Sequence, residues 1–192
     1  PVLPSALPAG FTRPQATTIQ TCAMRIGIGG VSRAGKTTLA ERLVSILGPS
    51  RTLLLHQDAF ARPLDTIPRI YGKLDWEDPR SLDLKAFHDA ILRHGRRGRH
   101  VVAEGLFAFY GPALAGAYDV RFMIRIGREE FFRRRAEDIR WGREPDWYME
   151  HVWESFQAYG EVGEDAPGYI HLDGTRLPDD QELTRLLGLP TT

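Results

Sequence analysis

The sequence predicts an α/β fold in which a five-stranded, mostly parallel sheet is flanked by helices. Three observations support this prediction. Short apolar runs typical of buried strands alternate with amphipathic runs typical of helices. A glycine-rich segment joins the first strand-like run to the first helix-like run, and the 192 residues are enough for one domain with a substantial core. We therefore expect a single domain over residues 24–192.

The strands of the sheet are expected at residues 24–29, 52–56, 100–103, 119–126 and 168–172. Apolar spacing, charge and terminating glycines predict helices at residues 38–47, 81–95, 128–141, 146–160 and 179–188. Residues 60–80 contain three prolines and a glycine, so we expect an irregular loop there. A loop of this length in a compact domain is often functional.

Residues 1–23 differ in composition from the rest of the chain. They contain four prolines and no acidic residue, and the first acidic residue of the chain is Glu41. This composition predicts a poorly ordered N-terminal extension. An organelle transit segment is the alternative, but prolines disfavour its amphipathic helix and arginines are too few.

Bulk composition excludes several classes of partner. The formal net charge is zero, so no global field favours nucleic acid or an anionic membrane. No apolar stretch approaches the roughly 18 residues that a membrane helix needs. The single cysteine, Cys22, excludes an intrachain disulfide and fits a reducing compartment. We therefore expect neither a nucleic acid nor a membrane as a partner.

The glycine-rich segment is a complete phosphate-binding loop with the pattern G-x-x-x-x-G-K-T. It reads Gly30, Val31, Ser32, Arg33, Ala34, Gly35, Lys36 and Thr37, and a second threonine, Thr38, follows. Glycines let the backbone wrap round a phosphate with its N–H groups pointing inward, and the following helix adds its positive end. Lys36 is expected to reach the β- and γ-phosphates, and the Thr37 hydroxyl to hold Mg²⁺. The strand, loop and helix order predicts a P-loop NTPase fold.

Two acidic residues follow predicted strands at the edge where this fold builds its sites. Asp58 comes after the second strand and is expected to orient or deprotonate an acceptor hydroxyl. Glu104 comes after the third strand, in the position that holds Mg²⁺ directly or through water. The alternatives are a turn-capping aspartate and an ordinary surface glutamate.

Two further groups of residues have both a functional and a structural interpretation. Arg133, Arg134, Arg135 and Arg140 could stabilise a transferring phosphoryl group or form a solvated helix face. Trp76, with Glu77 and Asp78, could stack on a planar ring and bind a ribose diol. It could equally be a packed tryptophan beside a helix-capping aspartate.

These residues together resemble the uridine-kinase-like family of P-loop kinases, and within it the nicotinamide riboside kinases. The resemblance covers roughly residues 24–187 and includes the following segments: 30–38, Gln57-Asp58-Ala-Phe60, Trp76-Glu-Asp-Pro79, Glu104-Gly105-Leu-Phe107, Arg133-Arg-Arg135, Tyr148-Met-Glu-His151-Val-Trp153 and His171-Leu-Asp-Gly-Thr175. It implies a nucleoside-kinase-like fold with a helical lid, in a cytosolic enzyme that phosphorylates the 5′-hydroxyl of a nucleoside with ATP and Mg²⁺.

The resemblance also implies roles for individual residues. Asp58, Lys36, Arg135 and Arg140 take catalytic positions, although Asp138 stands where the family has a further lid arginine. Asp58, Phe60, Trp76, Glu77 and Asp78 take substrate positions; Glu77 replaces the aspartate usual for the ribose contact, and Asp78 could substitute for it. Asp173 and Thr175 would lie near the adenine of ATP.

Three functions remain open at this point. The first is phosphorylation of nicotinamide riboside for NAD synthesis, which the His151-Val-Trp153 segment favours. The second is a uridine or cytidine kinase. The third, from another class, is a regulatory NTPase without a small acceptor, and the acidic aromatic segment at 76–78 argues against it.

Overall fold

The computed structural model describes residues 23–138, 142 and 144–190. Its sheet has the strand order β2-β5-β1-β6-β7, and every neighbouring pair in it is parallel. The strands are β1 (Arg25–Gly30), β2 (Thr52–His56), β5 (His100–Glu104), β6 (Val120–Arg125) and β7 (Ile170–Asp173). Each predicted strand is confirmed to within two residues at either end. Of the predicted N-terminal extension, residues 1–22 lie outside the described part of the chain.

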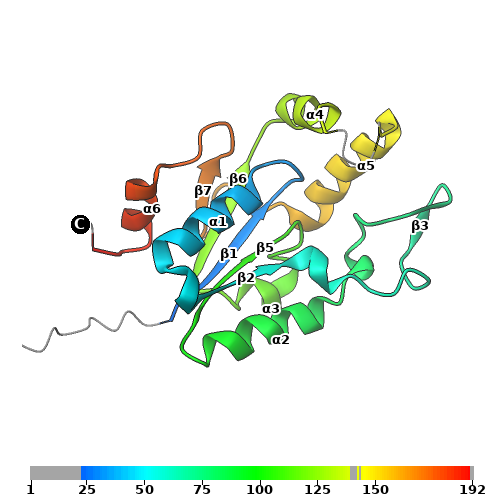
Figure 1. Ribbon diagram of the computed structural model, residues 1–192. Helices are drawn as coiled ribbons and strands as arrows, with labels where there is room; N and C mark the ends of the chain where they lie inside the picture. Colours follow the sequence, from blue (N-terminus) through cyan, green and yellow to red (C-terminus); the bar gives the residue numbers. More distant parts are fainter. Residues whose placement is uncertain (1–22, 139–141, 143, 191–192) are drawn as a thin grey trace, which may run out of the picture.

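The helices lie on both faces of this sheet. Figure 1 shows α1 and α6 on one face and α2 and α3 on the other. Helices α4 and α5 lie on the side towards which the carboxyl ends of the strands point. The helix bounds are α1 (Lys36–Leu47), α2 (Leu84–Gly95), α3 (Gly111–Ala115), α4 (Arg128–Ala136), α5 (Asp146–Ser155) and α6 (Asp180–Leu186). A parallel sheet covered on both faces is the arrangement that alternating strands and helices predict.

Local chemistry explains where the structure differs from the predicted helices. The helix predicted from residue 81 begins at Leu84, because the Asp83 side chain caps it by accepting from the Ala86 N–H at 2.9 Å. The helix predicted over 146–160 changes after Ser155 into a π-helical turn over Phe156–Gly160. The helix predicted over 128–141 ends at Ala136, and residues 139–141 lie outside the described part.

The long loop predicted at residues 60–80 has some regular structure of its own. A short antiparallel hairpin joins β3 (Arg69–Ile70) to β4 (Lys73–Leu74). A 3-10 turn, Gln57–Phe60, enters the loop, and a second, Pro79–Ser81, leaves it. A third short turn, Pro49–Arg51, connects α1 to β2.

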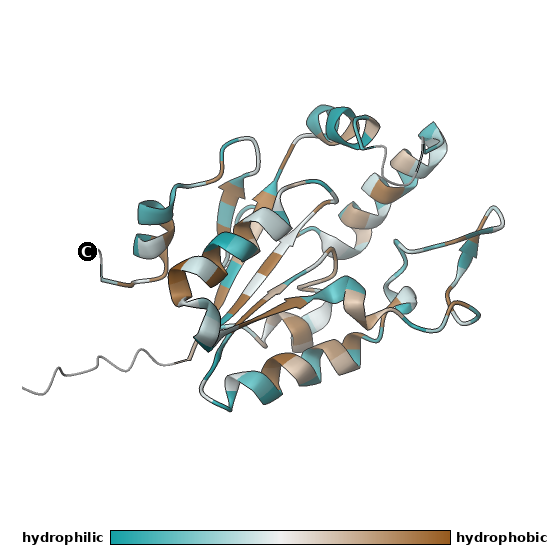
Figure 2. Cartoon of the chain, viewed as in Figure 1, coloured by the Kyte–Doolittle hydropathy of each residue, from teal (hydrophilic) through white to brown (hydrophobic). Residues whose placement is uncertain are grey.

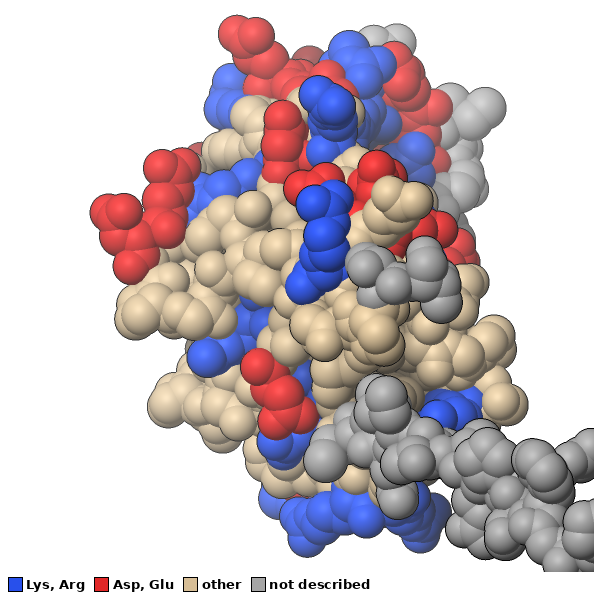
Figure 3. All heavy atoms as spheres, turned by 90° about the vertical axis from the view of Figure 1, so that its left-hand side faces the viewer, with Lys and Arg blue, Asp and Glu red and all other residues tan. Residues whose placement is uncertain are grey.

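The apolar core lies between the sheet and its helices. Figure 2 shows hydrophobic residues along the strands and on the side of α2 that faces the sheet. Ile26, Ile28, Val102 and Phe122 are completely buried, as expected for strands covered on both faces. In Figure 3, acidic and basic side chains are mixed at the top of the molecule, where α4 lies in Figure 1. Among the described helices, none has the length and apolar character needed to span a membrane.

Candidate active site

The candidate site lies at the carboxyl ends of the strands, where the direction of winding reverses. β1 is paired on one side with β5 and on the other with β6, and the chain leaves it for α1. The crevice beside such a reversal is where open α/β sheets bind ligands. The segments after β1, β2, β5 and β7 all emerge at this edge.

The phosphate-binding loop has the backbone conformation that its glycines predict. Gly30 has a φ of 151° and Gly35 a φ of 103°, both in the region that side chains disfavour. A Cβ on Gly30 would also lie 2.7 Å from the Ile124 carbonyl oxygen. Val31 and Ala34 are buried, at 1% and 0% exposure, and anchor the loop in the core. The loop therefore keeps its backbone free to face a phosphate group.

Lys36 begins α1 and is directed back over the loop. Its Nζ donates to the Val31 carbonyl oxygen at 3.0 Å. Burial lowers the pKa of this ammonium group, while the nearby carboxylates Glu104, Asp58 and Glu77 oppose that shift. A half-buried cation among carboxylates at a helix N-terminus is suited to binding phosphate oxygens.

Thr37 and Glu104 form the candidate metal site. The Thr37 hydroxyl donates to Glu104 Oε1 at 3.2 Å, and the same oxygen lies 2.8 Å from His56 Nδ1. Hydroxyl and carboxylate oxygens are ligands that Mg²⁺ prefers, and Mg²⁺ commonly takes its remaining ligands from phosphates and water. The described residues contain no group of three or more His, Cys, Asp or Glu side chains that could hold a metal. The donor set thus fits Mg²⁺ bound together with a nucleotide rather than a closed protein site.

Asp58 lies in the turn that follows β2 and is exposed. Its carboxylate lies close enough to act electrostatically on both Lys36 and Glu77. The preceding Gln57 is 1% exposed, and its Oε1 accepts from the Phe107 N–H at 2.9 Å. A Cβ on Gly105 would lie 2.2 Å from that oxygen, which explains why glycine follows Glu104.

The three adjacent arginines of α4 have different environments. Arg133 is 57% exposed on its side chain and pairs with Glu130 and Glu137. The Arg134 guanidinium donates to the carbonyl oxygens of Arg33, at 3.1 Å, and Gly174, at 2.9 Å. These contacts give Arg133 a surface role and Arg134 a bridging role.

Arg135 contacts a side chain of the phosphate loop, whereas Arg134 contacts a backbone carbonyl oxygen of that loop. Arg135 donates to the Ser32 hydroxyl at 2.6 Å and makes a two-pronged contact with Glu144 at 2.6 and 2.7 Å. It also acts electrostatically on Lys36 and Glu77. The other predicted lid arginine, Arg140, lies outside the described residues.

The predicted acceptor residues lie on the segment that enters the Pro79–Ser81 turn. Trp76 is 40% exposed, so its ring is available for stacking. Burial raises the pKa of the Glu77 carboxyl to about 7, with Arg135 and Lys36 opposing the shift. Asp78 caps the turn, accepting from the Arg80 N–H at 2.8 Å, and its carboxylate also pairs with the Arg80 guanidinium.

Phe60 is half-buried and packs against the core. Its ring makes an edge-on contact with Phe87 of α2, with ring centroids 5.2 Å apart. The contact secures the turn that carries Asp58.

The segment after β7 packs against the phosphate loop. Asp173 Oδ1 accepts from the Thr175 N–H and hydroxyl at 2.8 and 2.7 Å, which closes a tight turn. A Cβ on the intervening Gly174 would lie 2.8 Å from the Ala34 carbonyl oxygen, so the two segments touch through their backbones. This contact places Asp173 and Thr175 beside the phosphate loop.

Three residues at the site have no counterpart in the sequence predictions of site residues: His56, Asp75 and His151. His56 is the last residue of β2, and its position directly before Gln57-Asp58 was the available signal. His151 Nε2 lies 2.8 Å from Asp75 Oδ1, although 76 positions separate the two residues. No local pattern indicates such a pair.

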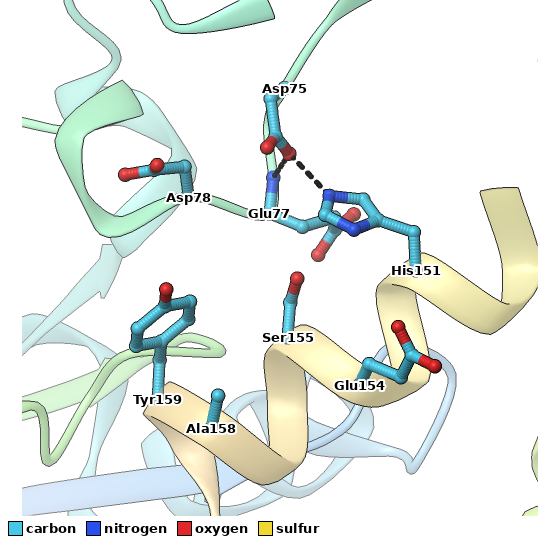
Figure 4. Close-up of a pocket in the computed structure, with 8 residues that line it drawn as sticks. All are labelled: Asp75, Glu77, Asp78, His151, Glu154, Ser155, Ala158 and Tyr159. Carbon is cyan, nitrogen blue, oxygen red and sulfur yellow. Dashed lines mark hydrogen bonds and ion pairs between the residues drawn. The ribbon is translucent and has the colours of Figure 1, made fainter. Parts of the chain in front are cut away.

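We call residues 75–78, which include the predicted acceptor contacts, the acceptor segment. A hollow of about 190 Å³ lies between this segment and α5. Figure 4 shows Asp75, Glu77 and Asp78 on the loop side, facing residues of α5 and the π-helical turn. Its lining residues are Asp75, Glu77, Asp78, His151, Glu154, Ser155, Ala158 and Tyr159.

Comparison with solved structures shows the fold. The chain superposes on an unliganded sugar kinase from Janibacter sp. with a TM-score of 0.62 and 21% identity, over 87% of this chain and 95% of that one. A gluconokinase from Sinorhizobium meliloti gives a TM-score of 0.53 and 15% identity, over 86% and 89% of the two chains. The predicted P-loop kinase fold is thereby confirmed.

Comparison with curated sequences shows the family, although no family model matches the chain. The chain is 26% identical over 172 residues to nicotinamide riboside kinase 1 of Homo sapiens, covering 81% of this chain and 86% of that protein. It is 26% identical to the uridine kinase of Saccharomyces cerevisiae over 68% of this chain but 32% of that protein. Nicotinamide riboside kinase 2 of Mus musculus is 30% identical over 175 residues, covering 80% of this chain and 89% of the mouse protein. By this similarity over most of both sequences, the chain belongs to the nicotinamide riboside kinase family.

Proposed function

We propose that this protein transfers the γ-phosphoryl group of ATP to the 5′-hydroxyl of nicotinamide riboside, giving nicotinamide mononucleotide and ADP. The observation that carries the proposal is the convergence of two predicted groups of residues. Glu77 of the acceptor segment lies within electrostatic reach of Lys36, Asp58 and Arg135. An acceptor held by Trp76 and Glu77 would therefore be next to the phosphate-binding loop.

The reaction breaks the bond between the γ-phosphorus and the β,γ-bridging oxygen and forms one from that phosphorus to the 5′-oxygen. Asp58 orients the hydroxyl and accepts its proton. Lys36 and Arg135 bind the non-bridging phosphate oxygens and stabilise the charge that they carry in the transition state. The backbone of residues 30–38 positions the phosphates, and Asp173 and Thr175 lie beside the adenine.

Thr37 and Glu104 would hold Mg²⁺, which neutralises charge on the β- and γ-phosphates when bound. His56 contacts Glu104 and so sets the direction of that carboxylate. Trp76 stacks on the pyridinium ring, and Glu77 binds the ribose hydroxyls. The remaining candidate, Asp78, is already engaged by Arg80, so we assign the ribose contact to Glu77.

A substrate panel tests the proposal. Purified protein is given ATP and Mg²⁺ with nicotinamide riboside, uridine or cytidine, and both ADP and the phosphorylated nucleoside are measured. We expect the highest kcat/KM for nicotinamide riboside. A preference for uridine or cytidine would contradict the proposed acceptor and favour the second candidate, which the similarity to yeast uridine kinase supports.

The same assay without a nucleoside tests the alternative from another class. A regulatory NTPase would release ADP at the same rate whether or not an acceptor is present. We expect ADP formation to depend on the nucleoside and to match the phosphorylated product mole for mole. Repeating the panel with GTP measures the preference for the donor.

A further inference from the structure

Asp75 and His151 form a mostly buried side-chain pair between the acceptor segment, residues 75–78, and α5. Asp75 Oδ1 lies 2.8 Å from His151 Nε2, and the two side chains are 11% and 19% exposed. Figure 4 shows His151 extending from its helix towards the loop, with the contact at the edge of the hollow. An ionised carboxylate can only accept, so Nε2 of His151 is the donor.

Asp75 connects this contact directly to the acceptor residues. The same Oδ1 atom accepts from the Glu77 N–H at 3.1 Å, which orients the peptide group between Trp76 and Glu77. The Asp75 N–H donates to the Pro68 carbonyl oxygen at 2.7 Å. Asp75 therefore joins the start of the acceptor segment to its own loop and to α5.

Other hydrogen bonds join the segment to neighbouring parts of the loop. Ser81 Oγ donates to the Trp76 carbonyl oxygen at 3.1 Å, and the Ser81 N–H donates to the Asp78 carbonyl oxygen at 2.9 Å. The Ser81 carbonyl oxygen accepts from the Arg62 N–H at 2.9 Å, which ties the turn at the far end of the segment to the residues after Asp58 but not to α5. The bond from His151 joins the segment to α5. Glu144, the partner of Arg135, lies two residues before this helix, so the helix is also close to the arginine side of the site.

A second contact between the loop and α5 has a different character. Trp147 packs edge-on against Tyr71 at 5.0 Å, and the Lys73 ammonium lies 5.8 Å from the Trp147 ring centroid. These contacts involve the tip of the hairpin, where Tyr71 is 84% exposed. They hold the hairpin rather than residues 75–77, so the buried pair is better placed to position the acceptor residues.

We propose that Asp75 and His151 are positioning residues for the nucleoside. The pair holds Trp76 and Glu77 at the distance from Lys36 and Arg135 that brings the acceptor hydroxyl into line with the phosphate. This inference rests on the proposed function, because it takes Trp76 and Glu77 as the nucleoside contacts. Small displacements of a reacting group are costly, which gives a single buried hydrogen bond a measurable effect on substrate use.

The experiment compares variants that remove the hydrogen bond with variants that retain it. His151→Ala and Asp75→Ala remove it. His151→Gln retains a donor near the Nε2 position, and Asp75→Asn retains an acceptor for both His151 and the Glu77 N–H. For each, kcat and the KM values for nucleoside and ATP are measured, with thermal unfolding as a check on the fold. His88→Ala is the matched control, because it removes a histidine beside an aspartate on α2.

We expect His151→Ala to raise the nucleoside KM about tenfold and to leave the ATP KM within about twofold. Asp75→Ala should do at least as much, and the double variant should be no worse than Asp75→Ala alone. The glutamine and asparagine variants should return the nucleoside KM to within about threefold of the wild type, and the control should not change it. If His151→Ala does not fold, His151→Asn replaces it, since its amide ends near the Nδ1 position and does not reach Asp75.

An unchanged nucleoside KM in the His151→Ala variant would overturn the inference while leaving the proposed function intact. An equal rise in the KM values for nucleoside and ATP would also overturn it. So would a His151→Gln variant that folds but keeps the raised nucleoside KM of His151→Ala. A wild-type protein that phosphorylates none of the nucleosides would overturn the proposed function and this inference together.

Discussion

The phosphate-binding loop takes its shape from its own residues, whereas the acceptor segment takes its position from a helix far along the chain. In the loop, positive-φ glycines and the buried Val31 and Ala34 determine the backbone path within eight residues. In the acceptor segment, Asp75 is bonded to His151, which is 76 positions away. The first region is preformed by local geometry, and the second depends on how the domain packs.

This difference has a consequence for how substitutions act. Residues of the phosphate-binding region should affect the chemical step, because they contact groups whose charge changes during transfer. Residues of the acceptor region should affect the nucleoside KM, because they set where the acceptor lies. Glu77 links the two, since it belongs to the acceptor segment but lies within electrostatic reach of Lys36.

The largest expected effect is that of Lys36→Ala. Removing this cation should lower kcat by about 10²- to 10³-fold, as expected for a lost charge-stabilising group. Its Nζ donates to one carbonyl oxygen, that of Val31, so the melting temperature should change little. Steady-state kinetics and thermal unfolding measure the two quantities. A kcat within tenfold of the wild type would contradict the role given to this region.

Asp58→Asn should have the next largest effect. Asparagine keeps the size of the side chain but cannot accept the hydroxyl proton, so kcat should fall by about 10²-fold with the nucleoside KM little changed. Asp58 is exposed, so the fold should be intact. Near-normal turnover by the folded variant would remove Asp58 from the proposed chemistry.

Glu104→Gln should raise the Mg²⁺ concentration needed for half-maximal activity by roughly tenfold or more, because a charged metal ligand becomes neutral. His56→Ala should act in the same direction but only severalfold, because His56 contacts the carboxylate rather than the metal. Titration of Mg²⁺ at saturating ATP measures both, and Mn²⁺ binding in the presence of a nucleotide gives a readout besides activity. If neither requirement changes, the metal site lies elsewhere.

The smallest expected effect is on pH dependence, and it concerns the residue between the two regions. Burial raises the pKa of Glu77 to about 7, so its carboxylate is mostly protonated at pH 6 and mostly ionised at pH 8. An ionised carboxylate accepts from both ribose hydroxyls, so the nucleoside KM should fall severalfold as pH rises from 6 to 8. Glu77→Gln should abolish that slope and Glu77→Asp should keep one. An equal slope in Glu77→Gln would assign it to another group.

Much of the fold follows from short-range patterns. Residues 52–56 match β2, and the other strands differ from their predicted limits by at most two residues, because buried parallel strands are continuous apolar runs. The five-residue helix α3, Gly111–Ala115, has no predicted counterpart, since it is too short for a helical period to appear. The hairpin within residues 69–74 is missing from the predictions for a similar reason, since each strand has two residues.

The phosphate-binding loop, the strand-end positions of Asp58 and Glu104, and the family can all be identified from the sequence alone. Each of these is encoded in contiguous residues whose backbone requirements or strand-end positions can be read locally. Packing in the folded structure decided that Arg134 and Arg135 reach the loop, through the Arg33 carbonyl and the Ser32 hydroxyl, whereas Arg133 pairs with surface glutamates. It also decided the pairing of Asp75 with His151. Side-chain contacts between distant elements depend on helix rotation and packing, which spacing along the chain does not specify.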